Sequence, residues 1–150
     1  MEESTKVQIY GIGQVKTPYG PVPALLLEDD RERVLVVIIG NFEASSIAAA
    51  LQGFKFPAPN THDFMMNVLK ELNATIKRGE VYGLQENRFL AKLVLDVSGE
   101  EIEIEGRPSD VIALTVRAGV RIYVAEKVMK ETSVKKSTLM KGTEKNENLE

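Results

Sequence analysis

The chain of 150 residues is 43% hydrophobic and 27% charged, a composition typical of one globular domain with a hydrophobic core. It has no cysteine and a single histidine, which excludes a disulfide framework and a cysteine nucleophile and nearly excludes a structural zinc site. Its formal net charge of −3 argues against a strong sequence-independent grip on nucleic acid, but not against an enzyme that holds magnesium through carboxylates. No apolar run approaches the roughly 20 residues that cross a bilayer, and the charged N-terminus lacks the apolar core of a signal peptide, so we expect a cytoplasmic protein without a membrane partner.

The first third of the chain predicts three strands joined by short turns. Apolar side chains recur along 6–16 and 22–28, and the β-branched run 33–39 is typical of a strand buried on both faces. Connections this short favour an antiparallel meander. Gly40 ends the third strand, and apolar side chains at helical spacing then predict a helix over about 43–52.

A polar stretch containing the only histidine follows this helix. A proline in it disfavours the helical region for the residue before it, so the next helix is expected over about 62–73, with Asn60 or Thr61 as its N-cap. His62 and Asp63 therefore stand at a helix N-terminus, where free backbone N–H groups favour anions. This placement indicates either an active site or a well-made helix cap, and residue chemistry alone does not choose between them.

The second half of the chain repeats the pattern of three strands and a helix. Strands are predicted over 75–84, 88–97 and 100–105, a helix over 109–118, and a last short strand over 121–124. The pairs Ile47-Ala48 and Ile112-Ala113 occupy corresponding places in two helices, which suggests an internal duplication. The predicted fold is α+β, with a mostly antiparallel sheet of six to seven strands and three principal helices, in a domain over residues 1–132. Residues 133–150 are polar and without periodicity, and they predict a mobile C-terminal tail.

Three short fragments contain the candidate functional residues. They are Ile39-Gly40-Asn41-Phe42-Glu43-Ala44, Pro59-Asn60-Thr61-His62-Asp63 and Arg107-Pro108-Ser109-Asp110. Their order and spacing resemble the bifunctional nuclease (BFN) domain family over roughly residues 5–130. The resemblance implies a compact α+β domain, often dimeric, in a family with members that degrade both RNA and DNA. Two positions depart from the family pattern, since Ala58 stands where an arginine is common and Val111 where an alanine is usual.

The candidate residues supply the groups that phosphodiester hydrolysis needs. Glu43, Asp63 and Asp110 could bind Mg²⁺ or another divalent cation through oxygen. His62 could act as a general base, and Arg107 could bind phosphate through two N–H groups. Each carboxylate also falls in the first turn of a predicted helix, where it stabilises the helix by roughly 0.3–1 kcal/mol without any function. A structural interpretation therefore stands beside the catalytic one.

Two functional hypotheses of different class follow. The first is a metal-assisted nuclease that hydrolyses phosphodiester bonds of RNA and DNA with little sequence preference and binds this substrate weakly. The second is a non-catalytic homo-oligomeric binding or regulatory module. A carboxylate cluster within about 5 Å of His62 and open to solvent favours the first, and buried, mutually satisfied pairs favour the second. The sequence shows neither a lysine-rich face nor an exposed aromatic row, which argues against single-strand binding as the main activity.

The sequence also predicts a homodimer, and it predicts that one arginine bridges the candidate segments. The strands 33–39 and 89–97 offer more apolar surface than a few short helices can cover, so we expect two copies to associate. Arg107 lies outside its helix and presents five donors in a flat fork, which suits a bridge between segments. We expect it to contact at least one of the three candidate carboxylates, with Asp63 as the first choice.

Overall fold

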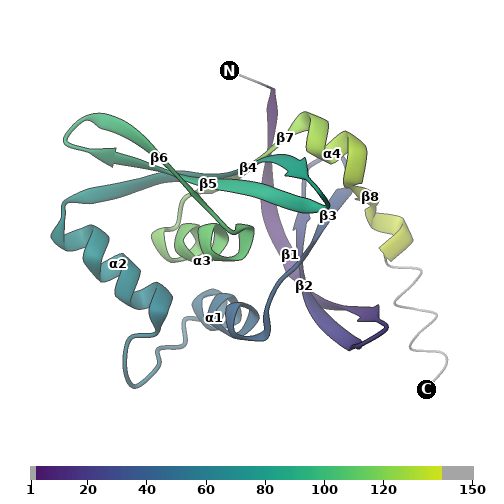
Figure 1. The fold of residues 1–150 in the computed structure, drawn as a ribbon, viewed down its shortest axis with the longest axis horizontal. Coiled ribbons are helices and arrows are strands. Elements are labelled where there is room, and N and C mark those ends of the chain that lie inside the picture. The colour runs from purple at the N-terminus through teal and green to yellow at the C-terminus, as the bar shows by residue number, and fades with distance from the viewer. Residues whose placement is uncertain (1–2, 140–150) are drawn as a thin grey trace.

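The computed structural model describes residues 3–139 and arranges them as one mixed sheet with helices packed beside it (Figure 1). The elements follow one another as β1 (Ser4–Thr17), β2 (Gly20–Glu28), β3 (Arg33–Ile38), α1 (Asn41–Gln52), α2 (Thr61–Glu71), β4 (Ala74–Gln85), β5 (Arg88–Val97), β6 (Glu100–Gly106), α3 (Pro108–Ala118), β7 (Arg121–Ala125), α4 (Glu126–Thr132) and β8 (Val134–Lys135). The strands lie in the order β6-β5-β4-β7-β1-β2-β3-β8. The expected α+β class and mostly antiparallel pairing are confirmed. The pair β4 and β7 is parallel.

The number of elements differs from the prediction. The sheet has eight strands rather than six or seven, while α4 and a short helical segment at 136–139 add to the three expected helices. Those three helices are confirmed, with bounds within two residues of the predicted ones. The additional strand, β8, has two residues, too few for any apolar alternation to show in the sequence.

Part of the expected C-terminal tail is folded against the sheet. Val134 of β8 pairs with Val34 of β3. Beyond it, Lys136 lies 2.8 Å from Glu28, measured from Nζ to Oε2. These contacts attach the chain to the outer edge of the first meander. The remainder of the expected tail, residues 140–150, lies outside the described residues.

Strand β7 joins the two halves of the sheet. It pairs antiparallel with β1, where Thr5 faces Val124, and parallel with β4, where Gly79 faces Ile122. The meanders β1-β2-β3 and β4-β5-β6 extend from β7 in opposite directions, and each leads into a helix, α1 or α3. This layout agrees with the repeat expected from the sequence, while the duplication itself stays a prediction.

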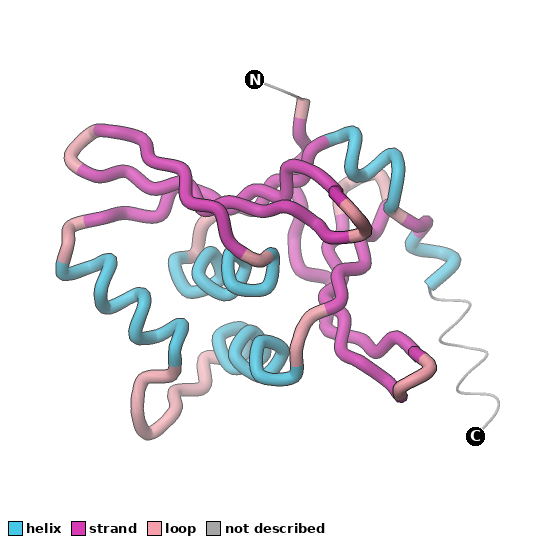
Figure 2. The backbone as a smooth tube through the Cα atoms, viewed as in Figure 1, coloured by secondary structure: helices cyan, strands magenta, loops and turns pink. Residues whose placement is uncertain are grey.

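The helices α1, α2 and α3 lie together on the same side of the sheet, with the long loop between α1 and α2 at their edge (Figure 2). α3 contacts β4 and β5, and both α1 and α2 contact α3. Helix α3 therefore occupies the centre of the helical layer. Between residues 3 and 139, no helix is long and apolar enough to cross a membrane.

A glycine lets α3 approach the sheet closely. Five consecutive residues of this helix, Val111 to Thr115, are buried. Gly79 of β4 lies directly beneath them, and a Cβ atom at this position would be 2.5 Å from Cγ2 of Thr115 and 3.0 Å from Cγ1 of Val111. Real Cβ atoms essentially never come within 3.0 Å of another heavy atom, so Gly79 sets the distance between helix and strand.

We expect Gly79→Ala to lower the free energy of unfolding by about 1–3 kcal/mol, because Thr115 and Val111 must move to admit the methyl group. Urea unfolding followed by circular dichroism measures this. Gly11→Ala is the matched control, since Gly11 also lies in a strand but a Cβ there meets nothing within 4 Å. Equal losses in the two variants would contradict the close packing of α3 on β4.

Candidate active site

Three helices begin near one another, and their first turns bring the candidate residues together. Glu43 lies in the first turn of α1, His62 and Asp63 lie in that of α2, and Arg107 and Asp110 flank the start of α3. Hydrogen bonds link all five residues into one network, directly or through two further side chains. Carboxylates in the first turn of a helix also interact favourably with the positive end of its dipole, which stabilises the helix.

The sequence motifs have local structural reasons. Gly40 is the N-cap of α1, and a side chain there would collide with Oε2 of Glu43, so glycine leaves room for this carboxylate to fold back over the helix start. Asn60 is the N-cap of α2, as expected, and forms a capping box. The side-chain Oδ1 of Asn60 accepts a hydrogen bond of 2.9 Å from the backbone N–H of Asp63. The backbone N–H of Asn60 donates a hydrogen bond of 3.1 Å to Oδ2 of Asp63.

His62 is buried, with 5% of its surface exposed, and both ring nitrogens are hydrogen-bonded. Nδ1 lies 2.6 Å from Oγ of Ser46, and Nε2 lies 2.9 Å from Oδ1 of Asp110. Oγ of Ser46 also accepts hydrogen bonds from Asn60 at 3.1 Å and from Arg117 at 2.9 Å. The serine hydroxyl therefore donates to Nδ1, and Nε2 carries the proton that is donated to Asp110. His62 is thus held by hydrogen bonds between two segments.

Arg107 joins two of the three candidate carboxylates. Its Nε lies 2.8 Å from Oδ2 of Asp110, and its Nη2 lies 2.9 Å from Oε1 of Glu43. Burial raises the pKa of Asp110, but the hydrogen bonds from Arg107 and His62 outweigh it and hold the pKa below its usual value. The expected bridging role of Arg107 is confirmed by these two contacts.

Asp63 does not belong to this group, and its choice as the first partner of Arg107 was wrong. Its Oδ1 accepts a hydrogen bond of 2.9 Å from Nε of Arg117, on the last turn of α3. This bond is the main reason why the pKa of Asp63 lies below its usual value, and burial opposes it. The two arginines lie at opposite ends of α3, so Asp63 faces the far end of that helix from Arg107.

Arg117 and Ser46 are the members of the network that the sequence analysis missed. Arg117 also donates to the backbone carbonyl of Ala113 at 3.1 Å and to both oxygens of Ser46, and its side chain is 10% exposed. One signal was present in the sequence. Asp110 and Arg117 are seven residues apart, two helical turns, so they share a face of a helix whose other residues are mostly apolar.

The exposed side of the network borders a cavity of about 360 Å³. Glu43, His62, Arg107 and Asp110 line this cavity, whereas Asp63 does not. The side chain of Arg107 is 63% exposed and that of Asp110 is 31% exposed. A cluster of carboxylates within about 5 Å of His62 and open to solvent was expected of a catalytic site, and Asp110, which is partly open to solvent, is the carboxylate that contacts the ring. A buried, fully hydrogen-bonded histidine was expected of a structural one. The site combines both features.

Two carboxylates are available for a divalent cation. Between residues 3 and 139 there is no group of three or more histidine, cysteine or acidic side chains that could hold a metal ion. Glu43 and Asp110 do approach each other, since both contact the same guanidinium of Arg107. Mg²⁺ often takes only one or two protein carboxylates and completes its shell with water and substrate phosphate, so these two are the donors that fit it.

Comparison with known proteins confirms the resemblance noted in the sequence. A family model described as the bifunctional nuclease domain matches residues 24–137. Two proteins of Mycobacterium tuberculosis, one from strain CDC 1551 and one from strain H37Rv, are each 36% identical to this chain over 129 residues. The aligned part covers 86% of this chain and 76% of each relative, and both relatives are described as uncharacterized.

We expect the two arginines of α3 to differ in their effect on stability. Arg117→Met should lower the free energy of unfolding by about 3 kcal/mol or more, because Asp63 loses the charge that balances it and buried Ser46 loses a charged donor. Arg107→Met should lower it by about 1 kcal/mol or less, because its ion pairs lie at the surface. Chemical denaturation of both variants tests this, and a larger loss for Arg107→Met would contradict the described burial.

Proposed function

This chain belongs to the bifunctional nuclease domain family, and from that premise we propose that it is a cytoplasmic nuclease that hydrolyses phosphodiester bonds of RNA and DNA with little sequence preference. One observation supports this most directly. The exposed guanidinium of Arg107 is held by Glu43 and Asp110 at the edge of a cavity. An arginine oriented in this way can bind a phosphate through its remaining N–H groups without first being ordered.

The proposed roles follow from the hydrogen bonds of each side chain. Arg107 binds the phosphoryl oxygens and stabilises the charge that develops on them. Glu43 gives Oε1 to Arg107, which leaves Oε2 to accept the proton of the attacking water. The water oxygen forms a bond to phosphorus while the ester P–O bond breaks, and the leaving oxygen takes a proton from solvent. Asp110 and His62 are positioning residues, because Asp110 orients Arg107 and His62 orients Asp110.

A divalent cation such as Mg²⁺ is part of the proposal. Glu43 and Asp110 would hold it through its bound waters, together with the substrate phosphate, since they are the acidic side chains that converge on Arg107. When bound, the cation neutralises phosphate charge and lowers the pKa of a coordinated water. Asp63 is left with a structural role, because its carboxylate is bonded to Arg117 and to the helix cap.

We expect the pure protein to cleave end-labelled RNA and DNA in the presence of Mg²⁺ and to lose this activity with a chelator. Glu43→Gln and Arg107→Met should each reduce the rate by about 100-fold or more, as expected for loss of a proton acceptor or of an electrostatic contact to the phosphate. Cleavage rates measured at a fixed protein concentration, with thermal unfolding followed in parallel, provide the comparison.

Glu103→Gln is the matched control, because Glu103 is an exposed glutamate on β6, outside the site. It should cleave at the rate of the unmodified protein. Residual cleavage of the same rate in all three variants would identify a contaminating nuclease and reject the proposed activity.

One observation favours a second function, that of a non-catalytic homo-oligomeric module. His62 has no free ring nitrogen, as expected if the motif residues mainly specify the fold. The apolar strands expected to form a dimer are largely buried within the chain instead. One exposed apolar surface lies on α2 and its C-cap, where the side chains Phe64, Met65, Val68 and Leu72 are 40–67% exposed. Both functions are compatible with a homodimer formed through this face.

We expect the protein to form a homodimer that is broken by the double substitution Phe64→Ser and Val68→Glu, because a buried charge and a lost aromatic ring disfavour the apolar contact. Light scattering at micromolar concentration measures the mass. Tyr19→Ser is the control, since Tyr19 is 99% exposed on the turn after β1. A monomer mass for the unmodified protein would exclude this dimer.

A further inference from the structure

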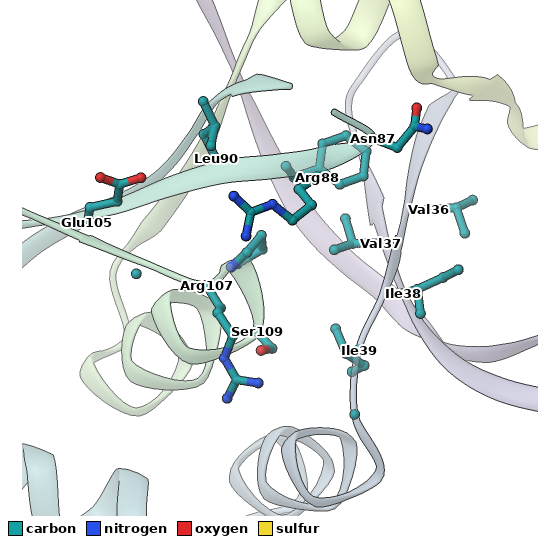
Figure 3. Close-up of a pocket in the computed structure, with 14 residues that line it drawn as sticks. Val36, Val37, Ile38, Ile39, Asn87, Arg88, Leu90, Glu105, Arg107 and Ser109 are labelled. Atoms are coloured by element: carbon teal, nitrogen blue, oxygen red, sulfur yellow. The ribbon is translucent and has the colours of Figure 1, made fainter. Parts of the chain in front are cut away.

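A second, larger cavity lies beside the candidate site. It has a volume of about 650 Å³ and is bordered by the end of β3, the start of β5 and the junction of β6 with α3 (Figure 3). Arg107 lines both cavities. The two cavities therefore share the residue to which the reacting phosphate was assigned.

An arginine with no ion pair faces this larger cavity. Arg88 is exposed, and Figure 3 shows its guanidinium directed into the cavity toward the segment that contains Arg107. Of the arginines between residues 3 and 139, Arg88 and Arg121 form no salt bridge. Glu105 also lines this cavity, and among the described residues it forms no ion pair with Arg88. An anion that enters the cavity can therefore bind Arg88 without displacing a protein carboxylate.

An aromatic ring is exposed on the other side of Arg107. Phe42, next to the candidate residue Glu43, is 90% exposed and lines the smaller cavity. Phe56 lines the same cavity. The sequence analysis expected no exposed aromatic row, and Phe42 is a single exposed ring rather than part of a row. An exposed ring beside a phosphate site is a common platform for a nucleobase.

We propose that the two cavities form one binding path for a single-stranded nucleic acid, in which Arg88 binds a phosphate next to the scissile one and Phe42 stacks on a base on the opposite side. The proposal rests on the proposed function for the position of the scissile phosphate at Arg107. Charge complementarity favours an anionic ligand, since Arg88 lines the cavity without an ion pair among the described residues, on a chain whose net charge is −3. A single strand is the occupant because stacking on a side chain requires a base that is not paired in a duplex.

The test is the binding of a fluorescein-labelled strand of 12 deoxythymidines, followed by anisotropy in chelator over a range of salt concentrations. Arg88→Gln should weaken binding and reduce the slope of log Kobs against log salt by about 0.7, the contribution of one phosphate contact on a single strand. Phe42→Ala should weaken binding at least about fivefold and leave the slope unchanged, because stacking releases no counterions. Within residues 3–139 neither side chain forms a hydrogen bond or an ion pair, so both variants should fold.

Two control variants match these changes. Arg121→Gln removes the other arginine that forms no salt bridge, and Tyr19→Ala removes an aromatic ring that is 99% exposed elsewhere. Both should bind as the unmodified protein does. A slope that falls equally in Arg88→Gln and Arg121→Gln, or an equal loss of affinity in Phe42→Ala and Tyr19→Ala, would overturn the path.

The outcome separates the path from the proposed activity. Binding that depends on Arg88 and Phe42 without any cleavage would support the path and reject the nuclease. Cleavage that depends on Glu43 and Arg107, combined with binding that is unaffected at Arg88 and Phe42, would support the nuclease and reject the path.

Discussion

The largely buried guanidinium of Arg117 holds the three helices in the arrangement that the candidate site needs. Its donors reach Asp63 at the start of α2 and Ser46 within α1. A buried charge is tolerated only when its donors find acceptors, so these helices can separate only by leaving a charge unpaired. Ser46 in turn orients His62, and His62 orients Asp110. The solvent-facing carboxylates therefore depend on a contact in the interior of the helical layer.

Each end of α3 has an arginine, and the two guanidinium groups have different roles. At the buried end, Arg117 satisfies most of its donors with protein acceptors and fixes the geometry. At the exposed end, Arg107 contacts two carboxylates and keeps much of its surface in water. The close approach of α3 to Gly79 sets the height of both arginines above the sheet. Helix α3, packed closely on β4 at Gly79, thus positions the arginine that is proposed to bind phosphate.

The sequence predicted the elements well because their signals are local. Apolar periodicity located the strands and helices, and the polar residues after a proline located the cap at Asn60. The five candidate residues were found because each lies near a glycine, a proline or a helix start. The partner of Asp63 was not found, because a basic residue such as Arg117 in a last helical turn is already explained by the helix dipole. The position of β7 and the pairing of β8 depend on distant segments, which leave no local pattern.

The central position of β7 has a consequence for biosynthesis. The ribosome releases the chain from its N-terminus, so β1 leaves long before the strand that pairs with its first residues. Until β7 emerges, part of β1 is an open edge that can pair with another chain, and contacts of such long sequence separation form slowly. The nascent protein therefore passes through a stage in which the start of β1 is open to aggregation or to a chaperone, and it leaves this stage only when nearly the whole domain has been synthesised.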